Sequence, residues 1–469
     1  MSEVVSQAKL NSDTSWLSAP ASRRAGLQSW WMLAVLYLIY VLSCLDTYII
    51  TMLAVPIKSD LHLTDFQIGL ILGPAVSLAH MIFSLPIGWM VDKFPRRLVL
   101  YAGVAIWSLA TAATGLANQF LTVVVARGIV GAGGAGLSPA SMSLLGDGFP
   151  RERLSTAIGI YQSGLKIGSA IAFGVGGLVI GLTAGRTFVV PVLGELHSWQ
   201  IILMMIGLPG LLLGLLVFTF AEPEKRVRAV ASAETATSGA TKTEADSLLS
   251  YCAENWRLLL PMFGGFVLMS LCAVASISWA PTYMHRRFNW NPEHYGVALG
   301  FISFASALAL MLKGVIVDWL FSLGTKDAPV RFFSWLIATM TPLAIITYLV
   351  SDPWVFLVLY GIVQLVAMPS IMYLYAALQL FSPSRIRGQL AALAGAVYAL
   401  VGFSIGPTLV GWLTDYVFHS DQMLGASMIT VFAIAMPLAF VLLRMTLKPL
   451  RDAVILAESQ ERKVVPDMA

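Results

Sequence analysis

Charged residues are scarce in this sequence. Asp, Glu, Lys and Arg together make up 12% of the 469 residues, about half of the ~25% that soluble globular proteins carry. The net charge of +4 is small, and no basic stripe runs along the chain, so a nucleic-acid surface is not indicated. The hydrophobic share is 58% and the mean hydropathy is +0.79. These values exclude an ordinary soluble domain and indicate a chain that crosses a membrane several times.

Cysteine is also rare, and its positions exclude two further classes. The three cysteines, Cys44, Cys252 and Cys272, have no paired spacing, and two of them lie in apolar runs. Neither a disulfide framework nor a metal site is therefore indicated. We expect no metal and no cofactor.

Signatures of two common enzyme classes are missing as well. The sequence contains no GxxxxGK[ST] phosphate loop and no HExxH pair. The glycine cluster GAGGAG at 131–136 lies inside an apolar run and follows no predicted strand, so it does not predict a dinucleotide site. We therefore expect a protein that is not an enzyme and that has no nucleic-acid partner.

Long apolar runs dominate what is present. About 20 helical residues cross a hydrocarbon core of ~30 Å, and twelve segments are that long. They lie near residues 31–56, 66–91, 98–118, 121–145, 155–182, 199–221, 258–284, 294–320, 331–350, 353–379, 387–414 and 424–446.

The positive charges predict the orientation of these spans. Of the 29 Lys and Arg residues, 22 fall on segments that twelve spans place in the cytoplasm and four on outer segments. This bias agrees with the positive-inside rule and puts both termini in the cytoplasm. The first 30 residues have no apolar segment before Trp31, so we expect no cleaved signal peptide.

The chain divides into two related halves. The segment after residue 221 is rich in Ala, Ser, Thr and Gly, and such a composition cannot bury apolar surface, so we expect a flexible tether. The fold class is all-α: twelve transmembrane helices in two pseudo-symmetric six-helix bundles. The expected parts are a cytoplasmic tail (1–30), the first bundle (31–221), a cytoplasmic linker (222–257), the second bundle (258–446) and a cytoplasmic tail (447–469).

One short connection stands out between two spans of the first half. GWMVDKFPRR places Asp92 four residues after Gly88 and adds Arg96 and Arg97. A weaker copy in the second half, GVIVDWL, repeats the spacing with Asp318. Matched six-helix halves are typical of transporters.

Two opposite charges are expected at the same depth of the first bundle. An ionisable side chain inside a bilayer costs at least ~2.5 kcal/mol, so each one needs a reason. Counting helical rise puts both Asp46 and Arg127 at about 21–22 Å from the cytoplasmic end. Gly131, Gly134 and Ser138 share the face of Arg127 and leave room for a cavity. The pair is interpreted as a proton site with a switchable partner, as a static ion pair, or as a direct substrate contact.

Lys166 lies in the middle of the fifth span, where Gln162 shares its helix face. An anion-binding role, a structural partner for a carbonyl or carboxylate, and a misplaced span all remain open. His80, central in the second span, can titrate near neutral pH or serve as a hydrogen-bonded packing residue. Lys313 is expected to snorkel to the inner surface.

Aromatic residues of the second half form a further candidate set. Trp279, Tyr283 and Tyr373 either line an amphipathic cavity or belong to the aromatic belt at the interfaces. Tyr398 lies deeper and is the better cavity candidate. On the outer side, Arg286 with its basic neighbours either receives anionic head groups or forms a solvated loop.

Several of these segments resemble the Major Facilitator Superfamily. GWMVDKFPRR is similar to its inner-loop signature, and the Arg127-x-x-x-Gly131 pattern resembles its fourth helix. More narrowly, residues 45–71, ARGIVGAGGAGLSPAS, FPRERLSTAIGIYQSG and SWAPTYMHRRF resemble bacterial members of the spinster-like branch. The match extends over nearly the whole chain.

The resemblance implies alternating access around a central cavity, and animal relatives in this branch export lysophospholipids or sphingosine-1-phosphate. It implies that Asp46 is the proton-sensing acid. Two positions depart from the pattern: Thr47 replaces the usual Arg, and Gly134 replaces the usual Glu. Lys166 is also unusual for the branch and suits an organic anion.

These observations predict a proton-coupled secondary transporter of the bacterial inner membrane. The substrate is an amphipathic or anionic small molecule, lysophospholipid-like; the alternative is a proton symporter of sugar acids or other carboxylates. Expected partners are this substrate, protons and membrane lipids, and we expect a monomer. The coupling residues are Asp46 and Arg127, and the substrate residues are Arg127, Lys166, Gln162, Tyr398 and His80. A receptor without transport and a passive lipid scramblase are the other classes considered.

The conformational switch is assigned to the two GxxxD segments. Its residues are Gly88, Asp92, Arg96, Arg97 and Asp318. Asp92 is expected to cap a neighbouring helix N-terminus in one state, where the helix dipole favours an anion.

Overall fold

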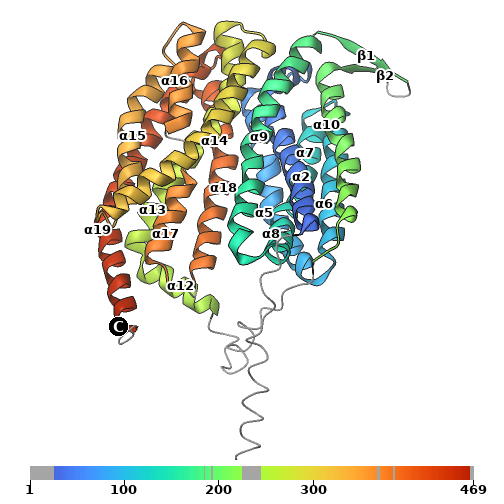
Figure 1. Cartoon of the computed structure of the whole chain (residues 1–469). Coiled ribbons are helices and arrows are strands. Elements are labelled where there is room, and N and C mark those ends of the chain that lie inside the picture. The colour runs from blue at the N-terminus through green and yellow to red at the C-terminus, as the bar shows by residue number, and fades with distance from the viewer. Residues whose placement is uncertain are drawn as a thin grey trace, which may run out of the picture.

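Long helices lie along one axis in two bundles in the computed structural model of the chain (Figure 1). The structure describes residues 26–183, 185–191, 194–223, 244–366, 370–383 and 386–464. The bilayer interior offers no hydrogen-bond partners to backbone N–H and C=O groups. A helix pairs these groups within itself, so apolar runs of this length fold as helices.

The first bundle holds ten helices in its described residues. They are α2 (Leu27–Met52), α3 (Ala54–Asp60), α4 (Asp65–Leu72), α5 (Pro74–Lys93), α6 (Arg96–Thr114), α7 (Phe120–Gly134), α8 (Leu137–Gly148), α9 (Arg151–Thr183), α10 (Ser198–Leu215) and the 3₁₀ turn η1 (Leu216–Thr219).

The second bundle follows after residue 243. Its helices are α12 (Glu244–Glu254), α13 (Trp256–Phe288), α14 (Pro292–Ser322), α15 (Ala328–Thr347), α16 (Pro353–Val366), α17 (Ile371–Phe381), α18 (Arg387–Trp412), the π-helical turn η2 (Leu413–Val417), the 3₁₀ turn η3 (Asp421–Met423) and α19 (Leu424–Val464).

The predicted set of spans agrees with this architecture. Eleven helical segments among the described residues are long and apolar enough to cross a membrane, and α14 stands at the place of the remaining predicted span. Three of these spans are built from two α-helices: α4 with α5, α7 with α8, and α16 with α17. Gly73, with φ −119° and ψ −91°, separates α4 from α5, whose first residue is Pro74. Proline is well tolerated there because the first helical N–H has no partner in any case.

Helices extend into two segments that we expected to lie outside the spans. We expected a tether without regular structure over 222–257, but residues 244–254 form α12; residues 224–243 lie outside the described part. We ended the last span near 446, but α19 continues to Val464. Neither segment is a long, uninterrupted apolar run, which is why a search for membrane spans did not indicate these helices.

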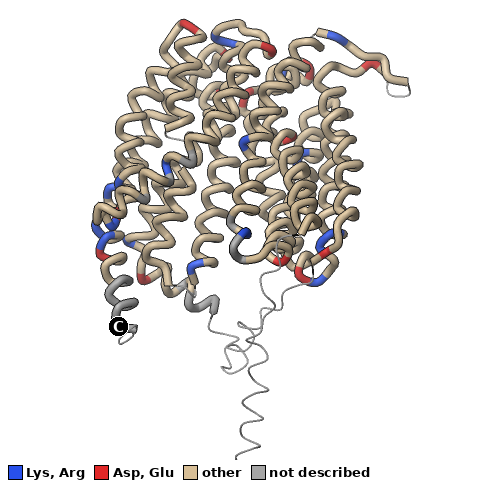
Figure 2. Tube along the Cα trace, in the orientation of Figure 1, with Lys and Arg blue, Asp and Glu red and all other residues tan. Residues whose placement is uncertain are grey.

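A two-stranded hairpin marks one end of the molecule. β1 (Thr187–Val190) pairs antiparallel with β2 (Gly194–His197), Thr187 opposite His197. We call this the hairpin end and the opposite end, which carries α12, the linker end (Figure 1). Lys and Arg concentrate toward the linker end (Figure 2), the side that the charge bias assigns to the cytoplasm.

The two bundles are packed together at the hairpin end. A buried hydrophobic cluster extends across both, from Ile49 and Phe173 to Trp279 and Leu299, whereas a second cluster belongs to the first bundle alone. Glycines permit the close approach: a Cβ on Gly177 of α9 would lie 2.9 Å from the Cα of Gly296 of α14. Side chains at this position would push the bundles apart.

The linker end is open between the bundles. Only Val91 is buried along α5, and side chains on different faces of this helix are exposed, including Phe83 (45%) and Leu85 (82%). The inner ion pairs of the described residues, such as Arg96 with Asp147, join groups within one bundle. The structure therefore has a closed hairpin end and an open linker end.

Candidate functional site

Asp46 and Arg127 form a buried ion pair in the first bundle. Arg127 Nη1 on α7 donates to Asp46 Oδ2 on α2 at 3.2 Å, and Trp107 Nε1 on α6 donates to the same oxygen at 3.1 Å. Both charged residues are 1% exposed. The ion pair that the matched depths predicted is present, and Trp107 is a partner that the sequence did not indicate.

The pair is not fully satisfied within the described residues. Asp46 Oδ1 and Arg127 Nε have no hydrogen-bond partner there. A buried charged group without its full set of partners is costly. Each unsatisfied buried group requires an explanation, and a functional role is one of them.

The small-residue stripe beside Arg127 has a different role from the one expected. We predicted that it leaves room for a cavity, but a Cβ on Gly131 would lie 2.9 Å from the carbonyl carbon of Val76 on α5. Gly131 therefore lets the α5 backbone approach α7. Gly134 has more space, since a Cβ at this position would lie 4.0 Å from its nearest neighbour, Nδ1 of His80.

Lys166 lies where the two bundles meet. It lines a small cavity of about 10 Å³ together with Phe173 of its own helix, which is space for roughly one water molecule. The other lining residues all belong to the second bundle: Ile277, Leu299, Ile302, Ser303, Ser306, Tyr360 and Gln364. A lysine of one bundle thus faces polar groups of the other.

The remaining substrate candidates are not all brought to this cavity. Gln162 is exposed and is absent from its lining, and His80 is exposed beside α7, where it bonds the main chain of Gly131. The hydroxyl of Tyr398 lies 2.9 Å from Ser370 Oγ, and Tyr48 interacts electrostatically with it. Only Tyr398 therefore lies near the meeting point of the bundles.

The other aromatic candidates are packing residues. Trp279 is 1% exposed and donates Nε1 to the carbonyl of Pro407 at 3.0 Å. Tyr283 is 3% exposed within an aromatic cluster with Tyr348, and Tyr373 is fully buried. None of the three lines the cavity of Lys166.

Lys313 does not snorkel to the surface as expected. It is 5% exposed on α14 and interacts electrostatically with Lys166 of α9. Because α14 crosses toward α9, the side chain stays inside the protein instead of following its helix to the linker end.

Arg96 of the GxxxD segment is the centre of a buried charge cluster. It is 0% exposed and binds Asp147 of α8 and, at 3.0 Å, Glu222. Arg97 donates to the carbonyl of Phe220 at 2.6 Å. Burial raises the pKa of Glu222, but hydrogen bonds from Arg96 outweigh burial, and this pKa lies below its ordinary value.

The other switch residues lie outside the cluster around Arg96. A Cβ at Gly88 would have no atom of another residue within 4 Å, and Asp92 is exposed. The side chain of Asp318 lies outside the described residues. Glu222 was missed in the sequence, although its place at the start of AEPEKR, directly after a span, is a signal that could have found it.

A second charge cluster joins the two bundles at the hairpin end. Arg286 of α13 donates from both terminal nitrogens to Asp65 of α4, at 2.6 Å each. Lys58 of α3 binds Asp65 at 2.7 Å and Asp421 of η3 at 2.5 Å. The side chain of Arg286 is only 11% exposed, so neither a solvated loop nor a free basic patch describes it.

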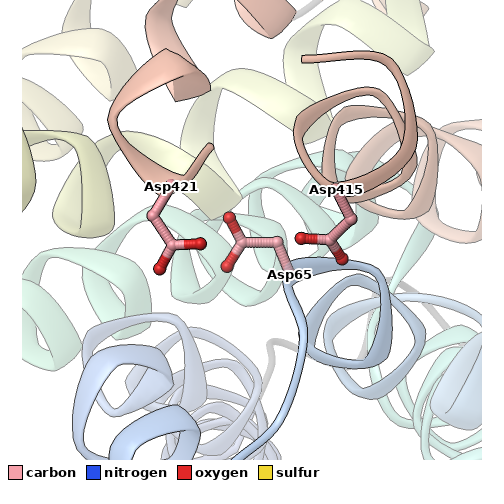
Figure 3. Close-up of side chains that lie close together, drawn as sticks. All are labelled: Asp65, Asp415 and Asp421. Atoms are coloured by element: carbon pink, nitrogen blue, oxygen red, sulfur yellow. The ribbon is translucent and has the colours of Figure 1, made fainter. Parts of the chain in front are cut away.

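Three carboxylates converge in this cluster (Figure 3). Asp65, Asp415 and Asp421 each place an oxygen within 4.8 Å of the others, and Asp415 also accepts the backbone N–H of Phe66 at 2.6 Å. Lys58 and Arg286 supply the positive charge beside these carboxylates. The cluster is therefore an ionic contact between the bundles.

Known proteins share this architecture. The sequence profile of the Major Facilitator Superfamily matches residues 36–407. The hexuronate transporter of Bacillus subtilis (strain 168) is 24% identical over 87% of this chain and 93% of its own length. Protein spinster homolog 1 of Xenopus tropicalis is 25% identical over 54% of this chain and 45% of its own.

A solved structure of similar fold is a bacterial homolog of the human lysosomal transporter Spinster in an inward-facing, unoccupied conformation. Its TM-score is 0.72 at 20% identity, over 95% of this chain and 100% of that one. The expected twelve-helix fold and the resemblance to the spinster-like branch are confirmed.

Proposed function

Since the chain belongs to the Major Facilitator Superfamily, whose members are membrane transporters and not enzymes, we propose that it is a proton-coupled secondary transporter. Its substrate is an amphipathic or anionic small molecule, lysophospholipid-like. It acts by alternating access in the bacterial inner membrane, with both termini and the linker end on the cytoplasmic side.

The buried Asp46–Arg127 pair is the observation that carries proton coupling. The carboxylate of Asp46 is 1% exposed, and one of its oxygens has no partner among the described residues. Gain or loss of its charge therefore changes the electrostatic energy of the groups around it. Protonation of Asp46 would leave the guanidinium of Arg127 without a counter-charge in a low-dielectric site. The cost is relieved when Arg127 turns to an anion or to water.

The closed hairpin end and the open linker end support alternating access. In the opposite state the bundles would separate at the Asp65–Arg286 contact and approach each other at the linker end. The proposed switch residues there are Gly88, Asp92, Arg96, Arg97 and Asp318, with Asp92 capping a neighbouring helix N-terminus in one state.

A lysolipid-like substrate is what the resemblance of the sequence to the spinster-like branch implies. The meeting point of the bundles adds an amphipathic surface, since Tyr48, Tyr360 and Tyr398 carry both rings and hydroxyls to the same region. Protons and the surrounding lipids complete the proposed partners, and the protein acts as a monomer.

An organic-anion symporter is the second candidate. Lys166 supports it because a cation inside the protein, facing the second bundle, favours a negatively charged substrate. Similarity to a protein named as a hexuronate transporter points in the same direction.

Transport by purified protein in liposomes tests the proposal. We expect an imposed proton gradient to drive accumulation of either lysophosphatidylethanolamine or D-glucuronate. Asp46→Asn should abolish this accumulation but retain exchange of the same substrate between equal pools, because exchange requires no net proton movement. Asp60→Asn, an aspartate bonded to Trp199 and outside the pair, is the matched control.

Unchanged gradient-driven accumulation by Asp46→Asn would refute the coupling role. If the wild-type protein moves lysolipid at the same rate with and without a proton gradient, this would instead indicate a scramblase. Binding of substrate without any movement would indicate a receptor.

A further inference from the structure

Lys166 presents a charge to the interface between the bundles. Its ammonium group has no ion pair and no hydrogen bond with any other residue that the structure describes, while the opposite wall of its cavity belongs to the second bundle. A cation at this depth requires an anion or polar partners. The missing partner is therefore to be sought in a ligand.

The wall that Lys166 faces carries hydroxyl and amide groups. Ser303 and Ser306 are three residues apart on α14 and share one face of that helix. Ser306 Oγ donates to the carbonyl of Gln364 at 3.2 Å, and Gln364 Nε2 donates to Ser276 Oγ at 3.1 Å. These bonds hold the wall rigid and orient its polar groups before a ligand arrives.

A second lysine belongs to the same region. Lys313 follows Ser306 by two helical turns on α14, is 5% exposed, and interacts electrostatically with Lys166. Two like charges from opposite bundles repel each other in a medium of low dielectric constant. An anion between them would convert this repulsion into attraction.

We propose that the anionic head of the substrate binds at the Lys166 cavity, where Lys166 and Lys313 hold it from the two bundles. The inference rests on the proposed transport function and adds the substrate class: a carboxylate or phosphate attached to an apolar or polyol body. Phe173, Ile277 and Leu299 line the rest of the cavity and would contact that body.

The size of the cavity adds a condition. In this conformation it has room for about one water molecule, so α9 and α14 must separate locally before the head group enters. Binding of the anion then supplies the counter-charge that lets the bundles close again. Substrate charge and bundle closure are thereby linked through two side chains.

Equilibrium binding to the purified protein tests this site. The charged probes are D-glucuronate and lysophosphatidylglycerol, which represent a free organic anion and a lipid head group. Their uncharged counterparts are D-glucose and monoacylglycerol. We expect thermal stabilisation by at least one charged probe and none by its counterpart, and the probe that acts identifies the source of the anion.

Variants assign the effect to the two lysines. Lys166→Gln and Lys313→Gln should each weaken binding of the charged probe about tenfold to a hundredfold, the usual contribution of a hydrogen bond to a charged group. Lys166→Arg should restore much of the affinity. Lys448→Gln, an exposed lysine of α19, should have no effect.

The inference is overturned if neither charged probe binds, if both counterparts bind equally well, or if Lys166→Gln retains full affinity. Because binding is measured without a proton gradient, these results do not depend on Asp46. Loss of gradient-driven uptake with intact, Lys166-dependent binding would refute only the coupling mechanism.

Discussion

Replacing Asp65 by asparagine should shift the protein toward a state with an open hairpin end. Asp65 is fully buried and accepts two hydrogen bonds of 2.6 Å from Arg286 of the other bundle. Its bond to Lys58 stays within the first bundle, so opening of the hairpin end does not require that bond to break. Of the two ion pairs of Asp65, only the one with Arg286 therefore joins the bundles and favours the closed hairpin end.

The structure sets the size of this shift. An asparagine keeps one oxygen that can accept from Arg286, so the substitution removes about one hydrogen bond to a charged group, worth ~1.5–3 kcal/mol. Since 1.4 kcal/mol is a factor of about ten, the ratio of closed to open hairpin ends should fall roughly 10-fold to 150-fold.

Distance measurements between spin labels follow this equilibrium. Cysteines at Ser59 and Ser351, both exposed at the hairpin end, place one label on each bundle. Cys252 is partly exposed, so the background carries Cys252→Ser, while Cys44 and Cys272 are buried. Asp65→Asn should increase the population with the longer distance.

Asp60→Asn is the matched control for this measurement. Asp60 bonds Trp199 at 2.8 Å and His197 at 3.1 Å, both in its own bundle. The reasoning fails if the distance distribution of Asp65→Asn matches the wild type, or if Asp60→Asn shifts it equally.

Three further predictions concern other contacts. Arg127→Gln leaves the Asp46 carboxylate buried without its cation and should lower the free energy of unfolding by about 3–5 kcal/mol, and the double variant with Asp46→Asn should recover part of the loss in thermal unfolding. The pKa of Glu222 is depressed in the fold, so its contribution to stability is present above the unfolded pKa of ~4.3 and is lost as the pH falls through the folded value. Glu222→Gln should therefore lower the melting temperature at neutral pH and make it less sensitive to acid, and equal acid sensitivity would contradict this. Gly177→Val should open the hairpin end in the same spin-label assay, because even a Cβ would press on the facing helix, whereas Gly159→Val, with nothing within 4 Å, should not.

Local chemistry made most of the fold predictable. The length of each apolar run and the positions of Lys and Arg depend on contact with lipid and with the membrane surface, and neither requires knowledge of a partner helix. The Asp46–Arg127 pair was predictable for a related reason. Both charges lie in spans, and helical rise alone places them at one depth.

Contacts between distant segments were not predictable in this way. Arg286 looked like a solvated residue because its neighbours are basic and polar, yet Asp65, 221 residues earlier in the chain, neutralises it. Lys313 looked like a snorkelling lysine because its own helix ends nearby. Its burial depends on α14 crossing over α9 of the other bundle.

The sequence by itself determined that the chain is a two-part bundle of transmembrane helices with buried charges at a shared depth, since hydropathy and helical rise are properties of each segment alone. Only the tertiary structure decided which end is closed, that Lys166 faces the second bundle, and which carboxylates hold Arg96 and Arg286. The physical reason is that an ion pair or a close helix crossing depends on the packing of two segments. The residue pattern of one segment alone therefore does not predict such a contact.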